Sequence, residues 1–327
     1  MIFLHGAAFL VAFVILFKCA DLFVDGASRI ATILNIPKLV IGIVLVGLAT
    51  TAPEFAVSVV AALRGLPEIA LGNAIGSVIV DDGVALALAA ILAPTVIFIN
   101  CRMLRIIGAF LLSIDFLAYF LARDGVLSRW EGLILLSLLG VYFVLLFKVR
   151  SFRTPGLSDG SEAPNSSGPR LSQAARRDLK APVIKILIGL AGVILTAEII
   201  VRAAEYVARY FAIPEIIIGS TIVAVGTSLP EVSTCITAAL RQEGELAVGN
   251  ILGADVLNIL WIIGVASLTN PIIVDLEIIN FKFPYMILMV TVMLVLMRIG
   301  CRLNRYKGFI LLGFYLLYLF LTFHLFL

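Results

Sequence analysis

Charged residues are scarce in this chain of 327 residues, and only one long polar segment interrupts it. Only 14% of the residues are charged whereas 62% are hydrophobic, a composition far too apolar for a soluble domain. Several apolar runs reach about 18 residues or more, enough to cross a hydrocarbon core of about 30 Å. The N-terminal run 2–17 lacks the basic region and the small-residue cleavage site of a signal peptide. We therefore interpret it as a membrane helix.

The sequence also lacks the patterns of several other protein classes. Its four cysteines, Cys19, Cys101, Cys235 and Cys301, follow no metal-binding or disulfide-framework spacing, so free thiols are predicted. The net charge is only +3 and the basic residues are spread among short loops, which does not indicate a nucleic-acid partner. Neither a GxGD motif nor another paired-aspartate signature of an intramembrane protease is found, so no enzyme is predicted.

A short motif with polar residues, ATTAPE from Ala49 to Glu54, lies inside one of the apolar runs. Pro53 has no N–H and its ring clashes with the preceding turn, so a helix that passes through it must break and free main-chain carbonyls. Glu54 places a carboxylate beside the break, and Asp81, 27 residues later, brings a second one from the next apolar run. In lipid, such groups are costly unless they line a protein cavity or meet a cation. The stretch therefore predicts a cation site inside the membrane.

The same arrangement occurs a second time. Adding 177 to each number leads to GTSLPE, which ends at Glu231, and then to Asn258 at the same distance of 27 residues. Residues 36–94 and 213–271 align without a gap. Identical pairs include Pro37/Pro214, Gly42/Gly219, Thr50/Thr227, Pro53/Pro230, Glu54/Glu231, Arg64/Arg241, Gly72/Gly249, Asn73/Asn250 and Gly76/Gly253. Asp21 falls opposite Glu198 in the same register.

The chain divides into a first five-helix repeat (1–150), a flexible linker (151–181) and a second five-helix repeat (182–327). The linker is rich in Ser, Gly, Pro and Arg and has no hydrophobic period. An odd number of spans in each half inverts the second half in the membrane. The predicted fold is thus an all-α integral membrane protein with ten transmembrane helices in two inverted five-helix repeats, and with the site near mid-membrane. The ten predicted spans are 2–20, 37–63, 69–94, 104–122, 131–148, 183–203, 213–240, 246–269, 281–299 and 307–327.

The basic residues predict the orientation. If the N-terminus is outside, the cytoplasmic ends and loops contain all but six of the 24 Lys and Arg residues, in agreement with the positive-inside rule. We therefore expect a multi-pass protein of the cell membrane, plasma or inner, with both termini outside and the linker in the cytoplasm.

The paired patterns (G/A)-T-(S/T)-x-P-E and G-N-x-x-G-(S/A)-x-x-x-(D/N) resemble the cation/calcium antiporter superfamily, and within it the prokaryotic sodium/calcium exchangers. The resemblance implies Na⁺-driven exchange of Ca²⁺ by alternating access, with Ca²⁺ held chiefly by Glu54 and Glu231 and with Na⁺ at neighbouring oxygen sites. The partners are then Ca²⁺, Na⁺ and membrane lipid, and no cofactor is expected. The other positions that match family ligands are Thr50, Thr51, Ser77, Asp81, Thr227, Ser228 and Asn258. A related antiporter with H⁺ coupling or another divalent cation is the alternative, although T-x-P-E in place of G-N-x-x-E favours sodium.

The chain departs from the family pattern at several positions. Ala254 stands where the family often has a serine, and Asp81 and Asn258 reverse the acid and amide common among prokaryotic members. Asp255 lies three residues before Asn258, hence on about the same helix face, so it is a further candidate ligand, with a helix-flank role or a paired role as the alternative. Asp82 projects about 100° away from Asp81 and is expected behind the site.

Other polar and small residues have simpler interpretations. Asp115 has no repeat partner, so a local hydrogen bond or an ion pair between helices is predicted for it rather than a ligand role. Asp21 and Glu198 either line an ion path or are solvated helix-end residues. The glycines of the G-N-x-x-G motifs, at 72, 76, 249 and 253, are predicted to allow close packing of helices.

Overall fold

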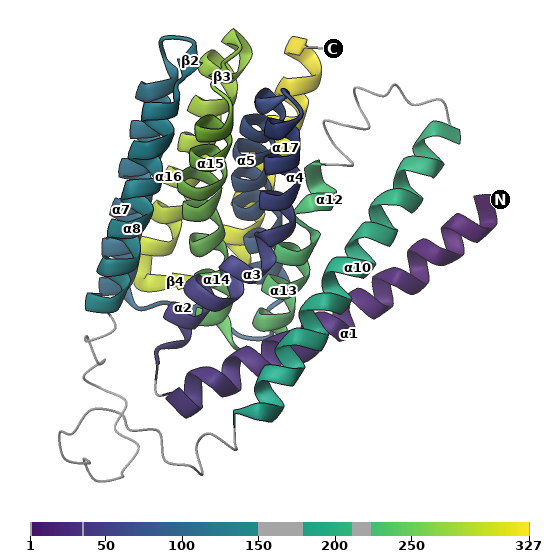
Figure 1. Cartoon of the computed structure of the whole chain (residues 1–327). Helices are drawn as coiled ribbons and strands as arrows, with labels where there is room; N and C mark the ends of the chain where they lie inside the picture. Colours follow the sequence, from purple (N-terminus) through teal and green to yellow (C-terminus); the bar gives the residue numbers. More distant parts are fainter. Residues whose placement is uncertain (1, 35, 150–178, 211–223, 327) are drawn as a thin grey trace.

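The computed structural model describes residues 2–34, 36–149, 179–210 and 224–326, and nearly all of them are helical (Figure 1). Within these ranges, seven helices are long and apolar enough to cross a membrane, or eight if one bent pair forms a single span. The seven are Pro67–Leu92, Cys101–Ala122, Arg129–Leu146, Lys180–Ile200, Gly244–Thr269, Ile278–Cys301 and Arg305–Leu325. The prediction of an all-helical membrane protein is confirmed at this level. Most of the predicted linker, and the start of the predicted span 213–240, lie outside the described residues.

The two halves contain similar series of elements. The first half contains α1 (Ile2–Leu34), α2 (Lys38–Ile41), η1 (Gly42–Gly47), α3 (Leu48–Thr50), α4 (Ala52–Leu63), α5 (Pro67–Val80), η2 (Asp81–Ala85), α6 (Leu86–Leu92), β1 (Ile97–Phe98), α7 (Cys101–Ala122), β2 (Val126–Leu127) and α8 (Arg129–Val149). The second half contains α10 (Lys180–Tyr210), α12 (Ala224–Thr227), α13 (Leu229–Leu240), α14 (Gly244–Leu257), η4 (Asn258–Ile262), α15 (Ile263–Thr269), β3 (Ile272–Ile273), η5 (Ile278–Lys282), α16 (Phe283–Arg298), η6 (Ile299–Cys301), β4 (Arg302–Leu303) and α17 (Arg305–Phe326).

Four elements of the first half have counterparts whose first and last residues lie 177 positions further along the chain. These pairs are α4 and α13, α5 and α14, η2 and η4, and α6 and α15. The elements η2 and η4 are π-helical turns that begin at Asp81 and Asn258. Such turns interrupt the regular hydrogen-bond ladder and occur frequently at functional sites.

The helix that carries the ATTAPE stretch breaks at Thr51, two residues before the predicted Pro53. The segments Lys38–Thr50 and Ala52–Leu63 meet at an angle of 44°. Pro53 lies in the first turn of α4, where its missing N–H costs nothing, so the break precedes the proline. The hydroxyl of Thr50 lies 3.1 Å from the carbonyl oxygen of Val46.

The helix α1 continues to Leu34, well beyond the predicted span 2–20. It packs along α10, and the two helices run side by side, at an angle to the rest of the bundle (Figure 1). The pair contacts the bundle through α2, η1, α3, α12 and α13. In the bundle, Gly244–Thr269 is the most buried span at 83%, whereas Arg305–Leu325 is only 17% buried. The second copy of the motif therefore lies at the centre of the protein.

Two glycines of the second motif lie against η1 and α2. A Cβ atom on Gly249 would lie 2.3 Å from the carbonyl oxygen of Leu39, and one on Gly253 would lie 2.6 Å from that of Ile43. Neither position can hold a larger residue without moving the backbone. The predicted packing role is confirmed for these two glycines. Among the described residues it is wrong for Gly72 and Gly76, where a Cβ atom would have no atom of another helix within 4 Å.

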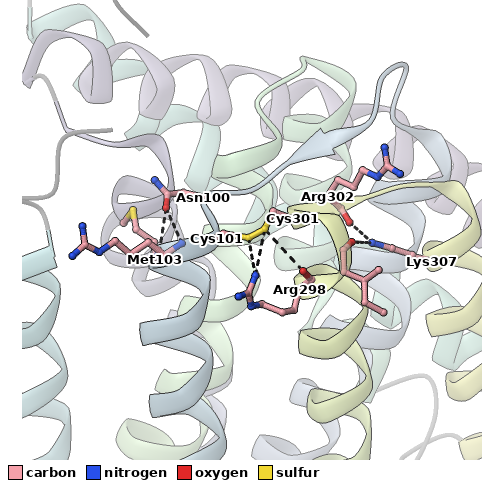
Figure 2. The surroundings of a disulfide bond; sticks show 9 residues. Asn100, Cys101, Met103, Arg298, Cys301, Arg302 and Lys307 are labelled. Atoms are coloured by element: carbon pink, nitrogen blue, oxygen red, sulfur yellow. Dashed lines mark hydrogen bonds between the residues drawn. A yellow bond between two sulfur atoms is a disulfide. The ribbon is translucent and has the colours of Figure 1, made fainter. Parts of the chain in front are cut away.

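The prediction that all four cysteines are free thiols is wrong for Cys101 and Cys301, which are joined by a disulfide (Figure 2). Their Cα atoms lie 5.4 Å apart although the residues are 200 positions apart in sequence. The pairing of β1 with β4 brings the start of α7 beside the turn that follows α16. The Nη1 atom of Arg298 lies 3.2 Å from the Sγ atom of Cys101. Cys19 and Cys235 are free, as predicted.

Candidate cation site

Glu54 and Glu231 lie in the first turns of α4 and α13, and their carboxyl groups are in contact. Each glutamate is only 1% exposed. The N-terminal turn of a helix favours a negative charge because its N–H groups are unpaired and its dipole is positive there. The hydroxyl of Thr51 donates to Oε1 of Glu231 at 3.3 Å. Asp81, at the start of η2, interacts electrostatically with both glutamates. The structure therefore brings together the three acids that the two motifs predicted.

Many oxygen atoms of this cluster are buried without a hydrogen-bond partner within the part of the chain that the structure describes. They are both carboxylate oxygens of Glu54 and of Asp81, Oε2 of Glu231, the hydroxyls of Ser77 and Ser228, and Oδ1 of Asn258. An unsatisfied buried polar group costs about 1–3 kcal/mol, and more when it is charged. Carboxylates in contact also repel each other when both are ionised. A bound cation would remove both penalties.

A pair of asparagines that sequence reasoning treated only as repeat markers connects the two halves at the site. The Nδ2 atom of Asn250 donates to the main-chain carbonyl of Glu231 at 3.4 Å. Its Oδ1 atom accepts from the hydroxyl of Thr50 in the other half at 3.1 Å. One amide thus holds the backbone of its own glutamate and a threonine of the opposite half.

Asn73 makes the equivalent contacts. Its Nδ2 atom lies 3.5 Å from the main-chain carbonyl of Glu54, and its Oδ1 atom accepts from the hydroxyl of Thr227 at 3.3 Å. Nδ2 also donates to the hydroxyl of Ser58 at 3.0 Å. Each asparagine therefore holds the main chain of the glutamate in its own half and a threonine of the other half. Their identity in both motifs was the available signal, but sequence alone does not show which groups they contact.

Thr234 is another residue that sequence reasoning missed. Its hydroxyl is buried without a hydrogen-bond partner among the described residues, and it follows Glu231 by three positions, hence on about the same face of α13. That helical spacing could have identified it.

Asp255 contacts Asp82 more closely than it approaches the glutamates. The carboxyl groups of Asp82 and Asp255 are within hydrogen-bonding reach of each other, and Asp115 interacts electrostatically with both. All three residues are fully buried, and apart from the contact between Asp82 and Asp255 their oxygens have no hydrogen-bond partner in the described ranges. The predicted local hydrogen bond or ion pair of Asp115 is therefore wrong. Asp255 also interacts electrostatically with Asp81.

The donor set is mixed in character. Among the residues with described positions, no three His, Cys, Asp or Glu side chains gather closely enough to hold a metal ion by themselves. A cation would therefore also need hydroxyl and amide oxygens, such as the unpaired ones of Ser77, Ser228 and Asn258. Ca²⁺ accepts this mixture, with six to eight oxygens at about 2.3–2.6 Å.

A helical membrane protein with this buried oxygen cluster has the features of a cation transporter, and comparison with known proteins makes the class more definite: it is a cation/Ca²⁺ antiporter. Residues 4–148 and 182–324 match the family described as sodium/calcium exchanger protein. The chain belongs to this family, and with it to the cation/calcium antiporter superfamily.

Two relatives and one solved structure illustrate the similarity. The chain is 33% identical over 272 residues to the inner membrane protein YrbG of Escherichia coli, covering 82% of this chain and 81% of the relative. It is 28% identical to the sodium/calcium exchanger MaX1 of Methanosarcina acetivorans, covering 99% and 100%. The solved structure of the sodium-calcium exchanger NCX_Mj soaked with 10 mM Na⁺ superposes with a TM-score of 0.82 at 28% identity, over the full length of both chains.

Proposed function

We propose that the protein exchanges Ca²⁺ for Na⁺ across the cell membrane by alternating access, through one cation site between two inverted five-helix halves. The observation that carries the proposal is the set of buried, unpaired oxygens around Glu54, Glu231 and Asp81. Inside a membrane protein such a set is costly without a cation. An ion that leaves is therefore best replaced by another ion, which is the requirement for exchange.

The proposed ligands come from both halves. Glu54 and Glu231 hold Ca²⁺, and hydroxyl, amide and acidic oxygens around them complete its shell and bind Na⁺ in its absence. These surrounding ligands are Thr50, Thr51, Ser77, Asp81, Thr227, Ser228, Asn258 and Asp255. The names of MaX1 and NCX_Mj as sodium/calcium exchangers support the choice of ions. We propose both termini outside and the linker 151–181 in the cytoplasm, because of the distribution of the basic residues.

One observation supports a second candidate, H⁺-coupled exchange. Asp82 and Asp255 contact each other without another hydrogen-bond partner among the described residues. Two carboxylates in contact are stabilised by a shared proton as well as by a cation. A proton taken up there would provide the coupling ion without Na⁺.

Ca²⁺ uptake into proteoliposomes distinguishes the two candidates. Vesicles loaded with Na⁺ and diluted into Na⁺-free buffer should take up Ca²⁺, and vesicles with a pH gradient alone should not. Uptake driven by the pH gradient and indifferent to Na⁺ would establish proton coupling instead. Uptake under neither gradient would reject exchange of Ca²⁺ by either route.

A further inference from the structure

Arg241, directly after α13, connects that helix to α1 and α10. Its guanidinium contacts the carboxylate of Asp21 and, at 3.1 Å, Oδ1 of Asp25, both on α1. Asp25 in turn contacts Nζ of Lys185 on α10 at 2.6 Å and Nε of Arg29 at 3.0 Å. The hydrogen bond to Asp21 raises the pKa of Arg241 further above its usual value, so the guanidinium stays charged. One arginine of the bundle is thus paired directly with α1, and through Asp25 it is linked to Lys185 on α10.

A second contact lies at the same end of the α1–α10 pair. Glu243, two residues after Arg241, pairs with Lys38 at the start of α2 and accepts a hydrogen bond from the hydroxyl of Ser28 on α1 at 2.7 Å. The side chains of Asp25, Glu243 and Arg241 are 19%, 17% and 33% exposed, whereas their partners Asp21 and Lys38 are 53% and 39% exposed. Such ion pairs contribute more than fully solvated ones. We call the contacts of Arg241 with Asp21 and Asp25 the first latch.

The repeat provides the same residues at the opposite end of the molecule. The counterpart of Arg241 is Arg64, directly after α4, and the counterpart of Asp21 is Glu198 on α10. In this structure Arg64 forms no ion pair with any described residue, and Glu198 contacts Nε of Arg202 on its own helix at 2.6 Å. The sequences correspond at the two ends, but among the described residues only one end is latched.

We propose that Arg241 and Arg64 are alternating gate residues of the transport cycle, a role that rests on the proposed function. In the state described here Arg241 holds the α1–α10 pair closed at the end that the basic residues place in the cytoplasm. In the opposite state this latch opens and Arg64 pairs with Glu198, which forms a second latch on the outside. In a carrier made of inverted halves, the two halves exchange conformations between the two states. A contact made by one half in one state is therefore made by the other half in the other state.

The two latches are not equally strong. Position 202, the counterpart of Asp25, is an arginine, so the second latch has one acid instead of two. Arg202 also competes with Arg64 for Glu198, as its 2.6 Å contact shows. The difference favours the state with the first latch closed. The substitution Arg202→Asp should therefore shift the protein towards the state with the second latch closed.

Cross-linking between engineered cysteines tests the exchange of partners. In a transport-competent background with the four native cysteines replaced by serine, one variant carries Asp21→Cys and Arg241→Cys, and another carries Glu198→Cys and Arg64→Cys. The control carries Arg64→Cys and Arg241→Cys, at opposite ends. A protease site in the linker reports whether a short bifunctional thiol reagent has joined the halves. Both test pairs should cross-link well above the control, and either cross-link should stop Ca²⁺ uptake until it is reduced. A Glu198/Arg64 pair that cross-links no more than the control overturns the proposal.

A second substitution tests the coupling between the latches. Added to the Glu198/Arg64 cysteine pair, Arg241→Gln should raise the cross-linking rate about three- to tenfold, the range expected when one or two partly exposed ion pairs are lost. Arg241→Lys, which keeps the charge, should restore most of the original rate, and Arg123→Gln in an outer loop should change nothing. An unchanged or lower rate with Arg241→Gln contradicts the exchange. Because cross-linking needs no ion gradient, exchanging latches without Na⁺-driven uptake would reject the proposed coupling ion but not the gate.

Discussion

Neutralising one of the paired glutamates should have opposite effects on the ion-free and the Ca²⁺-bound protein. In Glu54→Gln the amide replaces a carboxylate whose two oxygens are buried and unpaired, and its NH₂ group can donate to Glu231, which it contacts. Removing such a penalty contributes about 1–3 kcal/mol. The ion-free variant should therefore be more stable than the wild type, and its Tm should be higher by a few degrees.

The stabilisation against unfolding that Ca²⁺ provides should largely disappear in the same variant. At a Ca²⁺ concentration of about 100 Kd, the ion stabilises the wild type by about 2.7 kcal/mol. A 100-fold loss of affinity, about 2.7 kcal/mol of binding energy, leaves only about 0.4 kcal/mol at the same concentration. The assay is thermal unfolding of the purified protein in detergent, in chelator and in a Ca²⁺ series. Transport by the variant should be nearly abolished.

Asp115→Asn is the matched control for this experiment. Asp115 is as buried as Glu54 and its oxygens are equally unpaired, but it contacts neither glutamate. The control should be more stable than the wild type without ions, and Ca²⁺ should raise its Tm as much as it raises that of the wild type. A Glu54→Gln protein that keeps the wild-type Ca²⁺ gain, or that is less stable without ions, would refute the idea that these oxygens form one cation site.

Three further predictions concern charge, redox state and orientation. Asp81→Asn should weaken Ca²⁺ uptake, and adding Asn258→Asp should recover part of it because the charge returns at the equivalent position; a double variant no better than the worse single one would show that geometry, not charge count, matters. The disulfide that joins Cys101 and Cys301 in the structure should be found reduced in cells if this face lies in the cytoplasm as we propose, because the cytoplasm keeps thiols reduced; a disulfide found in cells whose thiols are blocked at lysis would place this face outside. Arg123→Cys should react with impermeant reagents only from outside, and reaction from the cytoplasm would reverse the proposed topology.

The local periodicity and breakers of the sequence predicted most helices within a few residues, because apolar length and Pro or Gly positions are local properties. Three boundaries differ: the break before Pro53, the end of α1, and the end of α10, which continues to Tyr210 instead of residue 203. The broken helix stops at Thr51 because Pro53 fits the first turn of the next helix. The helix α1 extends past its predicted end because Asp25 and Arg29 pair on one face and Asp21 meets Arg241.

The contacts between the halves could not be predicted in the same way. The motif arithmetic identified Glu54, Glu231 and Asp81, because a repeat preserves equivalent positions. It could not show that Asn250 reaches Thr50, or that Asp82 meets Asp255, since these contacts depend on how the halves are packed. The disulfide between residues 200 positions apart was not predicted for the same reason.

The claim that one site holds either Ca²⁺ or Na⁺ is tested most directly by competition at equilibrium. Binding of ⁴⁵Ca²⁺ to the purified protein would be measured while Na⁺ is increased at constant ionic strength, with choline as the replaced cation. If the two ions share the site around Glu54 and Glu231, Na⁺ should raise the apparent Kd for Ca²⁺ progressively and leave the number of bound Ca²⁺ ions at saturation unchanged. A Ca²⁺ affinity that is independent of Na⁺ would contradict the shared site.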